Sequence, residues 1–145
     1  MSLKDKVSPK LHLITINKEQ NQNTLKYLAQ NLKDFNLQET IITKHIEAKN
    51  IILNTKEITN FILIDNYNQE FFLCLSKIPK LIVTPCNNEF SASMAKEHNN
   101  SNILVLSTSI CGLDLNLQIV KNFLASNFLE GKHKERIATI CNYKG

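Results

Sequence analysis

Short apolar runs alternate with longer amphipathic segments along most of the chain. Runs of strand length occupy residues 10–16, 39–43, 61–65, 81–84 and 103–106. Between them, apolar side chains recur at helical spacing, as Leu25, Leu28 and Leu32 do within residues 22–35. Because strands that alternate with helices are typical of βαβ units, the pattern predicts an α/β fold: a Rossmann-like three-layer α/β/α sandwich with a roughly five-stranded parallel sheet.

The same pattern predicts the organisation of the rest of the chain. Further helices are expected at about residues 69–77, 89–98 and 113–128, with one more toward the end, whereas residues 45–56 indicate a shorter helix or an irregular crossover. Polar residues 1–9 are predicted to form a loose leader, followed by a single domain over residues 10–145. Ligands of such folds bind beyond the carboxyl ends of the strands. Asp65 and the loops after Ile16 and Leu106 should line that edge.

Charge and cysteine content exclude several classes of function. The formal net charge is +4, but the lysines are scattered among acids without a basic run, which argues against a nucleic-acid partner. No apolar run approaches the ~20 residues that span a bilayer, and the polar start lacks the apolar core of a signal peptide, so we expect a cytoplasmic protein without a membrane partner. The four cysteines lie far apart with no Cys-x-x-Cys pair, which favours reduced thiols over a metal site.

One segment near the end of the chain carries candidate anion-binding chemistry. Arg136 is the only arginine against sixteen lysines, and it lies four residues after Lys132 with His133 between them. On a helix this spacing puts both cations on one face. Near a helix N-terminus the unpaired N–H groups and the dipole also favour an anion, so the segment suits a phosphate. The alternative interpretation is a solvated helix face.

Four short motifs follow one another in the second half of the chain. They are Phe-Ser-Ala at 90–92, His98-Asn99, Cys-Gly at 111–112 and Gly-Lys-His-x-x-Arg at 131–136. Their order and spacing resemble the C-terminal half of the ribose-5-phosphate isomerase B family, which includes the two subunits of galactose-6-phosphate isomerase. The resemblance implies aldose–ketose isomerisation of a phosphorylated pentose or hexose, with no metal or organic cofactor. It assigns phosphate binding to Lys132, His133 and Arg136, and ring opening and hydroxyl binding to His98 and Asn99.

The first half of the chain departs from that family. After the first strand the family carries Asp-His, where this chain has Ile16-Asn17. After the third strand the family has Cys-Gly-Thr-Gly-x-Gly, where residues 65–70 contain no glycine, and a family arginine falls on Ser109. A tight cradle of backbone N–H groups uses glycine for close approach. Asp65 is then the only residue placed where the carbon base belongs.

These departures predict a sugar-phosphate isomerase of this type that is weak alone or that completes the site of a partner. The stretches Ile64-Asp65, Tyr67 and Lys77-Ile78 resemble the A subunit of galactose-6-phosphate isomerase, which pairs with a B subunit. Because the family's sites form between subunits, we expect a homodimer or higher oligomer, with a paralogous glycine-loop subunit as a further candidate partner. The alternative function is a catalytically silent paralogue that binds sugar phosphate or a protein partner.

Several of these residues also have a purely structural interpretation. His98 and Asn99 are compatible with the C-cap of a helix. Asp65 is compatible with the N-cap of the helix that follows it. No motif supports a role for His12 or His45, and neither is assigned one.

Overall fold

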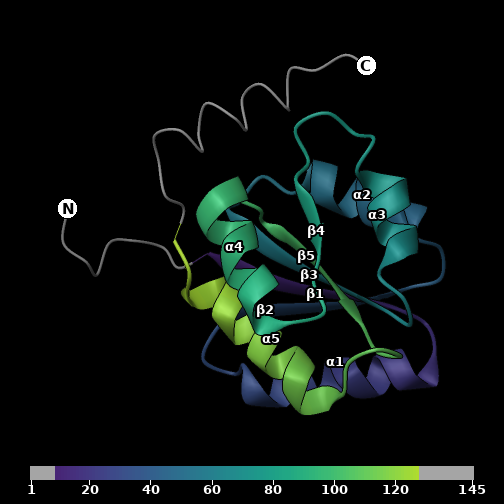
Figure 1. Cartoon of the computed structure of the whole chain (residues 1–145). Helices are drawn as coiled ribbons and strands as arrows, with labels where there is room; N and C mark the ends of the chain where they lie inside the picture. Colours follow the sequence, from purple (N-terminus) through teal and green to yellow (C-terminus); the bar gives the residue numbers. More distant parts are fainter. Residues whose placement is uncertain (1–8, 128–145) are drawn as a thin grey trace.

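The computed structural model describes residues 9–127. Within that range, five parallel strands form a sheet in the order β2-β1-β3-β5-β4 (Figure 1). The strands are β1 (Lys10–Ile16), β2 (Asn36–Ile42), β3 (Thr59–Asp65), β4 (Val83–Pro85) and β5 (Ile103–Ser107). β1, β3 and β5 are buried almost throughout, because a parallel sheet is covered on both faces.

Five helices connect and follow these strands in the described part of the chain. They are α1 (Glu19–Asn31), α2 (Ile46–Asn54), α3 (Gln69–Leu75), α4 (Glu89–Asn99) and α5 (Leu113–Ala125). α1, α4 and α5 cover one face of the sheet and α2 and α3 the other (Figure 1). Fully buried Leu28 and Phe123 anchor the first hydrophobic layer, and Phe71 and Leu75 anchor the second. The predicted three-layer α/β/α sandwich is confirmed.

The bounds of several elements differ from the predictions. α1 lies earlier than residues 22–35, because Lys18 already has the extended conformation of an N-cap and the chain turns after Leu32 toward β2. β4 covers only three residues, with Pro85 at its end, where the missing N–H is tolerated because Cys86 donates its N–H to Val105 of β5 instead. The segment predicted as a helix or irregular crossover contains α2. Residues 1–8 of the predicted leader and the helix predicted near the end of the chain lie outside the described residues.

The topology singles out one edge of the sheet as a ligand site. After β1 the chain enters α1 on one face, and after β3 it enters α3 on the opposite face. β1 and β3 are paired neighbours, so their carboxyl ends open into a crevice between diverging loops. Asp65 is the last residue of β3 and lies at this switch point, as predicted.

Candidate active site

Asp65 is buried at the end of β3, with protein groups at both carboxylate oxygens. Only 4% of the residue is exposed. Oδ2 lies 2.6 Å from Nε2 of His45, and Oδ1 accepts the backbone N–H of Asn66 at 2.8 Å. A longer contact of 3.5 Å joins Oδ1 to the side-chain amide of Asn21. These partners compensate the loss of water around a buried carboxylate, which is costly without them.

His45 reaches Asp65 from the loop between β2 and α2. It occupies the N-cap position of α2, but its side chain makes no capping hydrogen bond. Glu47 instead accepts two backbone N–H groups of the preceding loop. The imidazole packs edge-on against the ring of Phe71, with 4.7 Å between the ring centroids. The side chain of His45 therefore makes no capping bond to its own helix and is oriented toward the carboxyl end of β3.

The second ring nitrogen of His45 faces Glu70 at the start of α3. Nδ1 lies 3.4 Å from Oε2 of Glu70. The side chain of Glu70 is 70% exposed and that of His45 is 22% exposed, against 5% for Asp65. The imidazole thus bridges a buried carboxylate and a solvated one.

A set of amide and hydroxyl side chains extends the site toward β1 and β5. The Thr108 hydroxyl donates to Oδ1 of Asn21 at 2.6 Å, and the Asn21 amide donates to Oδ1 of Asn66 at 3.1 Å. The Asn66 amide donates in turn to Oε1 of Gln20 at 3.2 Å and lies 3.5 Å from Oγ of Ser109. This network joins α1 and the loops after β3 and β5 through side-chain amides and hydroxyls.

Two backbone N–H groups beside this network already have acceptors. Thr108 donates its N–H to the carbonyl oxygen of Asp65 at 2.8 Å, and Ser109 donates to that of Asn66 at 3.0 Å. An N–H group that is committed to a carbonyl cannot also stabilise a developing oxyanion without breaking that bond. These two N–H groups are therefore not available to an oxyanion.

The alternative that Asp65 caps the following helix is wrong. The N-cap of α3 is Asn68, three residues later, and it makes no side-chain capping bond there. Asp65 instead turns back to the N–H of the next residue and across to His45. The carboxylate therefore makes its contacts at the edge of the sheet and does not cap α3.

His45, Asp65 and Glu70 also form the group that comes closest to metal-binding geometry in residues 9–127. One ligand atom from each lies within 4.8 Å of the other two. However, the imidazole contacts Asp65 through one ring nitrogen and Glu70 through the other, on opposite sides of the ring. A shared ion would require one nitrogen and both carboxylates to converge on a single point. In this arrangement the imidazole bridges the two carboxylates, one at each ring nitrogen.

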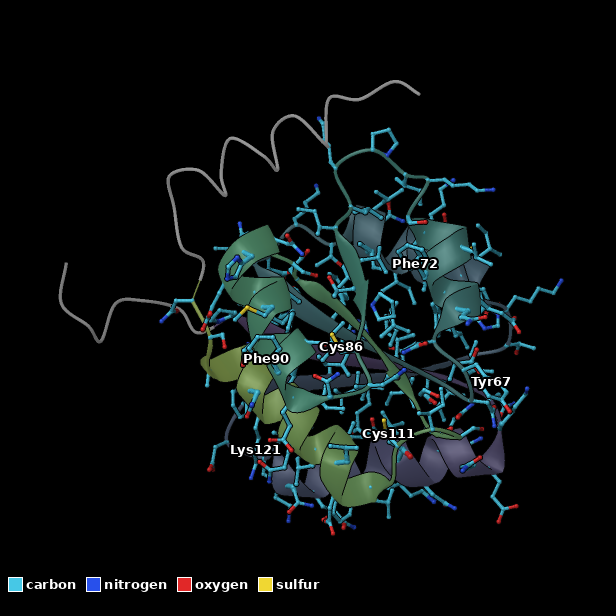
Figure 2. The ribbon with its side chains drawn as sticks, in the orientation of Figure 1. Tyr67, Phe72, Cys86, Phe90, Cys111 and Lys121 are labelled. Carbon is cyan, nitrogen blue, oxygen red and sulfur yellow. The ribbon has the colours of Figure 1, made fainter. Side chains whose placement is uncertain are left out.

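A cavity of about 200 Å³ opens at the same edge, between the start of α1 and the loop after β5. It is lined by Gln20, Asn23, Thr24, Thr108, Cys111, Gly112 and Leu113. Cys111, labelled in Figure 2, hydrogen-bonds through Sγ to the carbonyl of Asn87, and burial raises the pKa of its thiol. The thiol form is a poor base, so Cys111 does not replace the family's cysteine.

The structure does not bring His98 and Asn99 to Asp65 within one chain. Both lie in the last turn of α4, which runs back to the amino edge of the sheet. β3 spans seven residues, so about 20 Å of strand separates that edge from Asp65. The C-cap interpretation does not fit them either, because the cap is Asn100, in the left-handed region at φ 50°. Asn100 donates its N–H to carbonyl oxygens of α4.

A larger cavity of about 650 Å³ lies at this amino edge, next to Lys96. Nζ of Lys96 donates to Oδ1 of Asn60 at 2.6 Å and to the carbonyl of Ser101 at 3.0 Å, and it lies 4.4 Å from the ring centroid of Phe123. These contacts join α4 to β3 and α5. The lysine is structural, and the cavity is distant from the chemistry at Asp65.

Lys96 gives the fold a testable pH dependence. Burial lowers the pKa of Lys96 from 10.5 to about 8. Between these values the unfolded chain holds a proton that the folded chain has released, so the free energy of unfolding should rise with pH over this window. Urea denaturation at about pH 7.5 and about pH 10 should show a smaller rise in Lys96→Met than in the wild type. Equal rises in the two proteins would contradict this assignment.

The predicted phosphate-binding residues Lys132, His133 and Arg136 lie outside the described residues. Their placement relative to Asp65 therefore stays a prediction from the sequence. His45, in contrast, is a site residue that sequence reasoning missed. Its position two residues after the predicted strand 39–43 was the available signal, because the residues that follow parallel strands gather at one edge.

Comparison with known proteins identifies the family. The family model described as Ribose/Galactose Isomerase matches residues 16–140, which is most of the chain. The chain belongs to this family, and the resemblance that the spaced motifs indicated is confirmed.

Individual relatives match over shorter stretches. Galactose-6-phosphate isomerase subunit LacA of Enterococcus faecalis is 36% identical over 76 residues, which are 52% of this chain and 54% of that protein. The probable ribose-5-phosphate isomerase B of Mycoplasma genitalium is 32% identical over 72 residues, 50% of this chain and 47% of that protein. The chain thus spans about half the length of the curated relatives it matches.

Solved structures share the fold over nearly the whole chain. Ribose-5-phosphate isomerase B from Mycoplasma genitalium, with bound ribulose-5-phosphate, superposes with a TM-score of 0.79 at 21% identity over 95% of this chain and 98% of that one. The Thermotoga maritima enzyme gives 0.78 at 20% identity over 93% and 99%. The described helices include none with the length and apolar content to cross a bilayer.

Proposed function

We propose that the chain binds a phosphorylated pentose or hexose and takes part in its aldose–ketose isomerisation, weakly alone or as a subunit that completes a partner's site. The observation that carries this proposal is the buried Asp65–His45 pair at the switch point of a Ribose/Galactose Isomerase family fold. Proton transfer between adjacent carbons needs a positioned acid–base group, which this pair supplies. We therefore expect the protein to act in the cytoplasm.

Two copies of the chain are needed to assemble the proposed site. The resemblance assigns His98 and Asn99 to ring opening, yet they lie at the opposite sheet edge from Asp65. In a symmetric dimer the amino edge of one copy can meet the carboxyl edge of the other. Exposed apolar side chains beside the carboxyl edge support such a contact: Tyr67 and Phe90, labelled in Figure 2, are 59% and 72% exposed, and Ile110 is 57% exposed.

The alternative function is a silent paralogue that binds sugar phosphate or a protein partner. It is supported by backbone N–H groups that already have acceptors within the protein. The N–H groups of Thr108 and Ser109 already bond to carbonyl oxygens, and residues 65–70 contain no glycine. Binding needs only the anchors, whereas turnover also needs donors for the enediolate oxygen. A sensitive isomerisation assay separates the two functions, because the silent paralogue binds the sugar without converting it.

Binding of the phosphate group tests the proposed substrate class. Calorimetry with ribose 5-phosphate should give a dissociation constant between about 0.1 mM and a few mM, and Arg136→Ala should abolish most of the binding by removing a charged donor. Lys121→Ala, which removes an exposed cation from α5, serves as the matched control and should bind like the wild type. Unphosphorylated ribose should not bind. Unchanged binding in Arg136→Ala would show that residues 131–136 do not bind the phosphate group.

A further inference from the structure

We propose that His45 is the group that exchanges the proton with the sugar carbon, and that Asp65 is the positioning residue that orients its ring. This inference rests on the proposed function and adds to it the identity of the base. Asp65 is 4% exposed, and its two oxygens already accept hydrogen bonds from His45 and Asn66. A base must reach the proton that it removes, and a carboxylate enclosed in this way does not.

The imidazole of His45 meets the requirements that Asp65 does not. Its side chain is 22% exposed at the carboxyl edge, where the ligand of this fold is expected. A neutral imidazole carries one N–H, so donation from Nε2 to Asp65 at 2.6 Å leaves the lone pair of Nδ1 on the other side of the ring. The buried carboxylate thus fixes both the tautomer and the direction of the basic nitrogen.

Glu70 marks the side from which a substrate would approach. Its carboxylate lies 3.4 Å from Nδ1, yet its side chain is 70% exposed. A carboxylate that faces the lone pair of a neutral imidazole accepts no hydrogen bond from it, so the exposed side chain of Glu70 can move aside when a ligand arrives. The edge-on contact with Phe71 meanwhile keeps the imidazole plane in place. The ring therefore has a rigid, buried partner at Nε2 and a displaceable partner at Nδ1.

The proposed step conserves atoms and electrons. Nδ1 of His45 takes the proton from the carbon next to the carbonyl. The electron pair of that C–H bond becomes the double bond of the enediolate, while the carbonyl π pair moves to its oxygen. The proton of the hydroxyl on the deprotonated carbon then passes to the enediolate oxygen, through water, and a new carbonyl forms at that carbon. The imidazolium returns its proton to the former carbonyl carbon, so no oxidant or reductant is consumed.

The structural interpretation of the same contacts is a salt bridge that ties the loop before α2 to β3. Both interpretations predict that His45 variants lose some stability, so stability alone does not separate them. They differ in whether a small base from solution can replace the side chain. A structural link cannot be rescued in this way, whereas a missing proton acceptor can.

The test follows deuterium from solvent into the carbon-bound positions of ribulose 5-phosphate by NMR, with the full chain. His45→Gln should lower the exchange rate at least about 10²-fold while calorimetry shows unchanged binding of ribulose 5-phosphate. Asp65→Asn should also lower the rate, because the ring loses its orienting acceptor. Lys121→Gln, which changes an exposed residue of α5 away from the site, is the control and should stay within about fivefold of wild type. Imidazole added to His45→Gly should restore exchange.

Each of the following results would overturn the inference. The first is an exchange rate in His45→Gln equal to that of the wild type. The second is a His45→Gly variant that is folded by circular dichroism but whose exchange rate does not rise when imidazole is added. The third is binding of ribulose 5-phosphate to the wild-type protein with no exchange above the buffer rate. This result would leave the proposed binding intact and would refute the role of His45 as the base. Loss of wild-type exchange in EDTA would reassign the cluster to a metal ion. Absence of binding to wild type would instead refute the proposed function itself.

Discussion

The chain on its own should isomerise ribose 5-phosphate at least about 10⁴-fold more slowly than a typical enzyme with a kcat of ~10 s⁻¹. The resemblance puts Ile16-Asn17 at the family's Asp-His pair, and residues 65–70 contain no glycine with which to build an N–H cradle. Losing a positioned acid–base group and losing oxyanion donors each cost about 10²–10⁴ in rate. If the two losses multiply, the remaining site retains substrate anchoring and only slow proton transfer.

A partner that supplies the missing loop should raise this rate. The assay is conversion of ribose 5-phosphate and galactose 6-phosphate, followed by NMR over hours, with the chain alone and with a glycine-loop relative from the same genome. A rate above about 1 s⁻¹ for the chain alone on any pentose or hexose phosphate would contradict the prediction. It would mean that the side-chain amides of Asn21 and Asn66 stabilise the enediolate as well as backbone donors do.

Variants at Asp65 and at His98 should each lose the residual activity and should complement each other when mixed. One chain holds these residues at opposite edges of the sheet, with about 20 Å of β3 between them. A site that uses both must therefore take Asp65 from one copy and His98 from the other. A mixed dimer of the two variants contains one site in which both residues are intact.

The same argument requires an oligomer in solution. Sedimentation at micromolar concentration should give a dimer or larger, since a monomer would leave Asp65 without His98 and would leave Tyr67, Phe90 and Ile110 exposed.

The fold could be predicted from the sequence because its strands are buried on both faces and read as continuous apolar runs. Residues 61–65 and 103–106 are the clearest of these, and they form the centre of the sheet as β3 and β5. Element ends were less predictable. β4 covers only Val83–Pro85, and the start of α1 depends on the backbone conformation of Lys18, which apolar spacing does not report.

The site could be predicted only in part. Asp65 stands directly after an apolar run, so its place at the carboxyl edge follows from the topology of parallel sheets. His45 could not be paired with it from the sequence, because the contact joins the loop after β2 to the last residue of β3, and β1 lies between these strands in the sheet. The separation of His98 from Asp65 likewise depends on the direction in which α4 runs back across the sheet.

Mixing Asp65→Asn with His98→Asn tests the central claim, a sugar-phosphate site shared by two copies of the chain. The two purified variants are combined in equal amounts, dissociated in mild urea and reassembled, and residual conversion of ribose 5-phosphate is followed by NMR. Random pairing makes half of the dimers mixed, each with one intact site, so activity should return to about a quarter of the wild-type rate. Each variant reassembled alone should stay at the buffer rate. A mixture no more active than the separate variants, although sedimentation shows mixed dimers, would contradict the shared site.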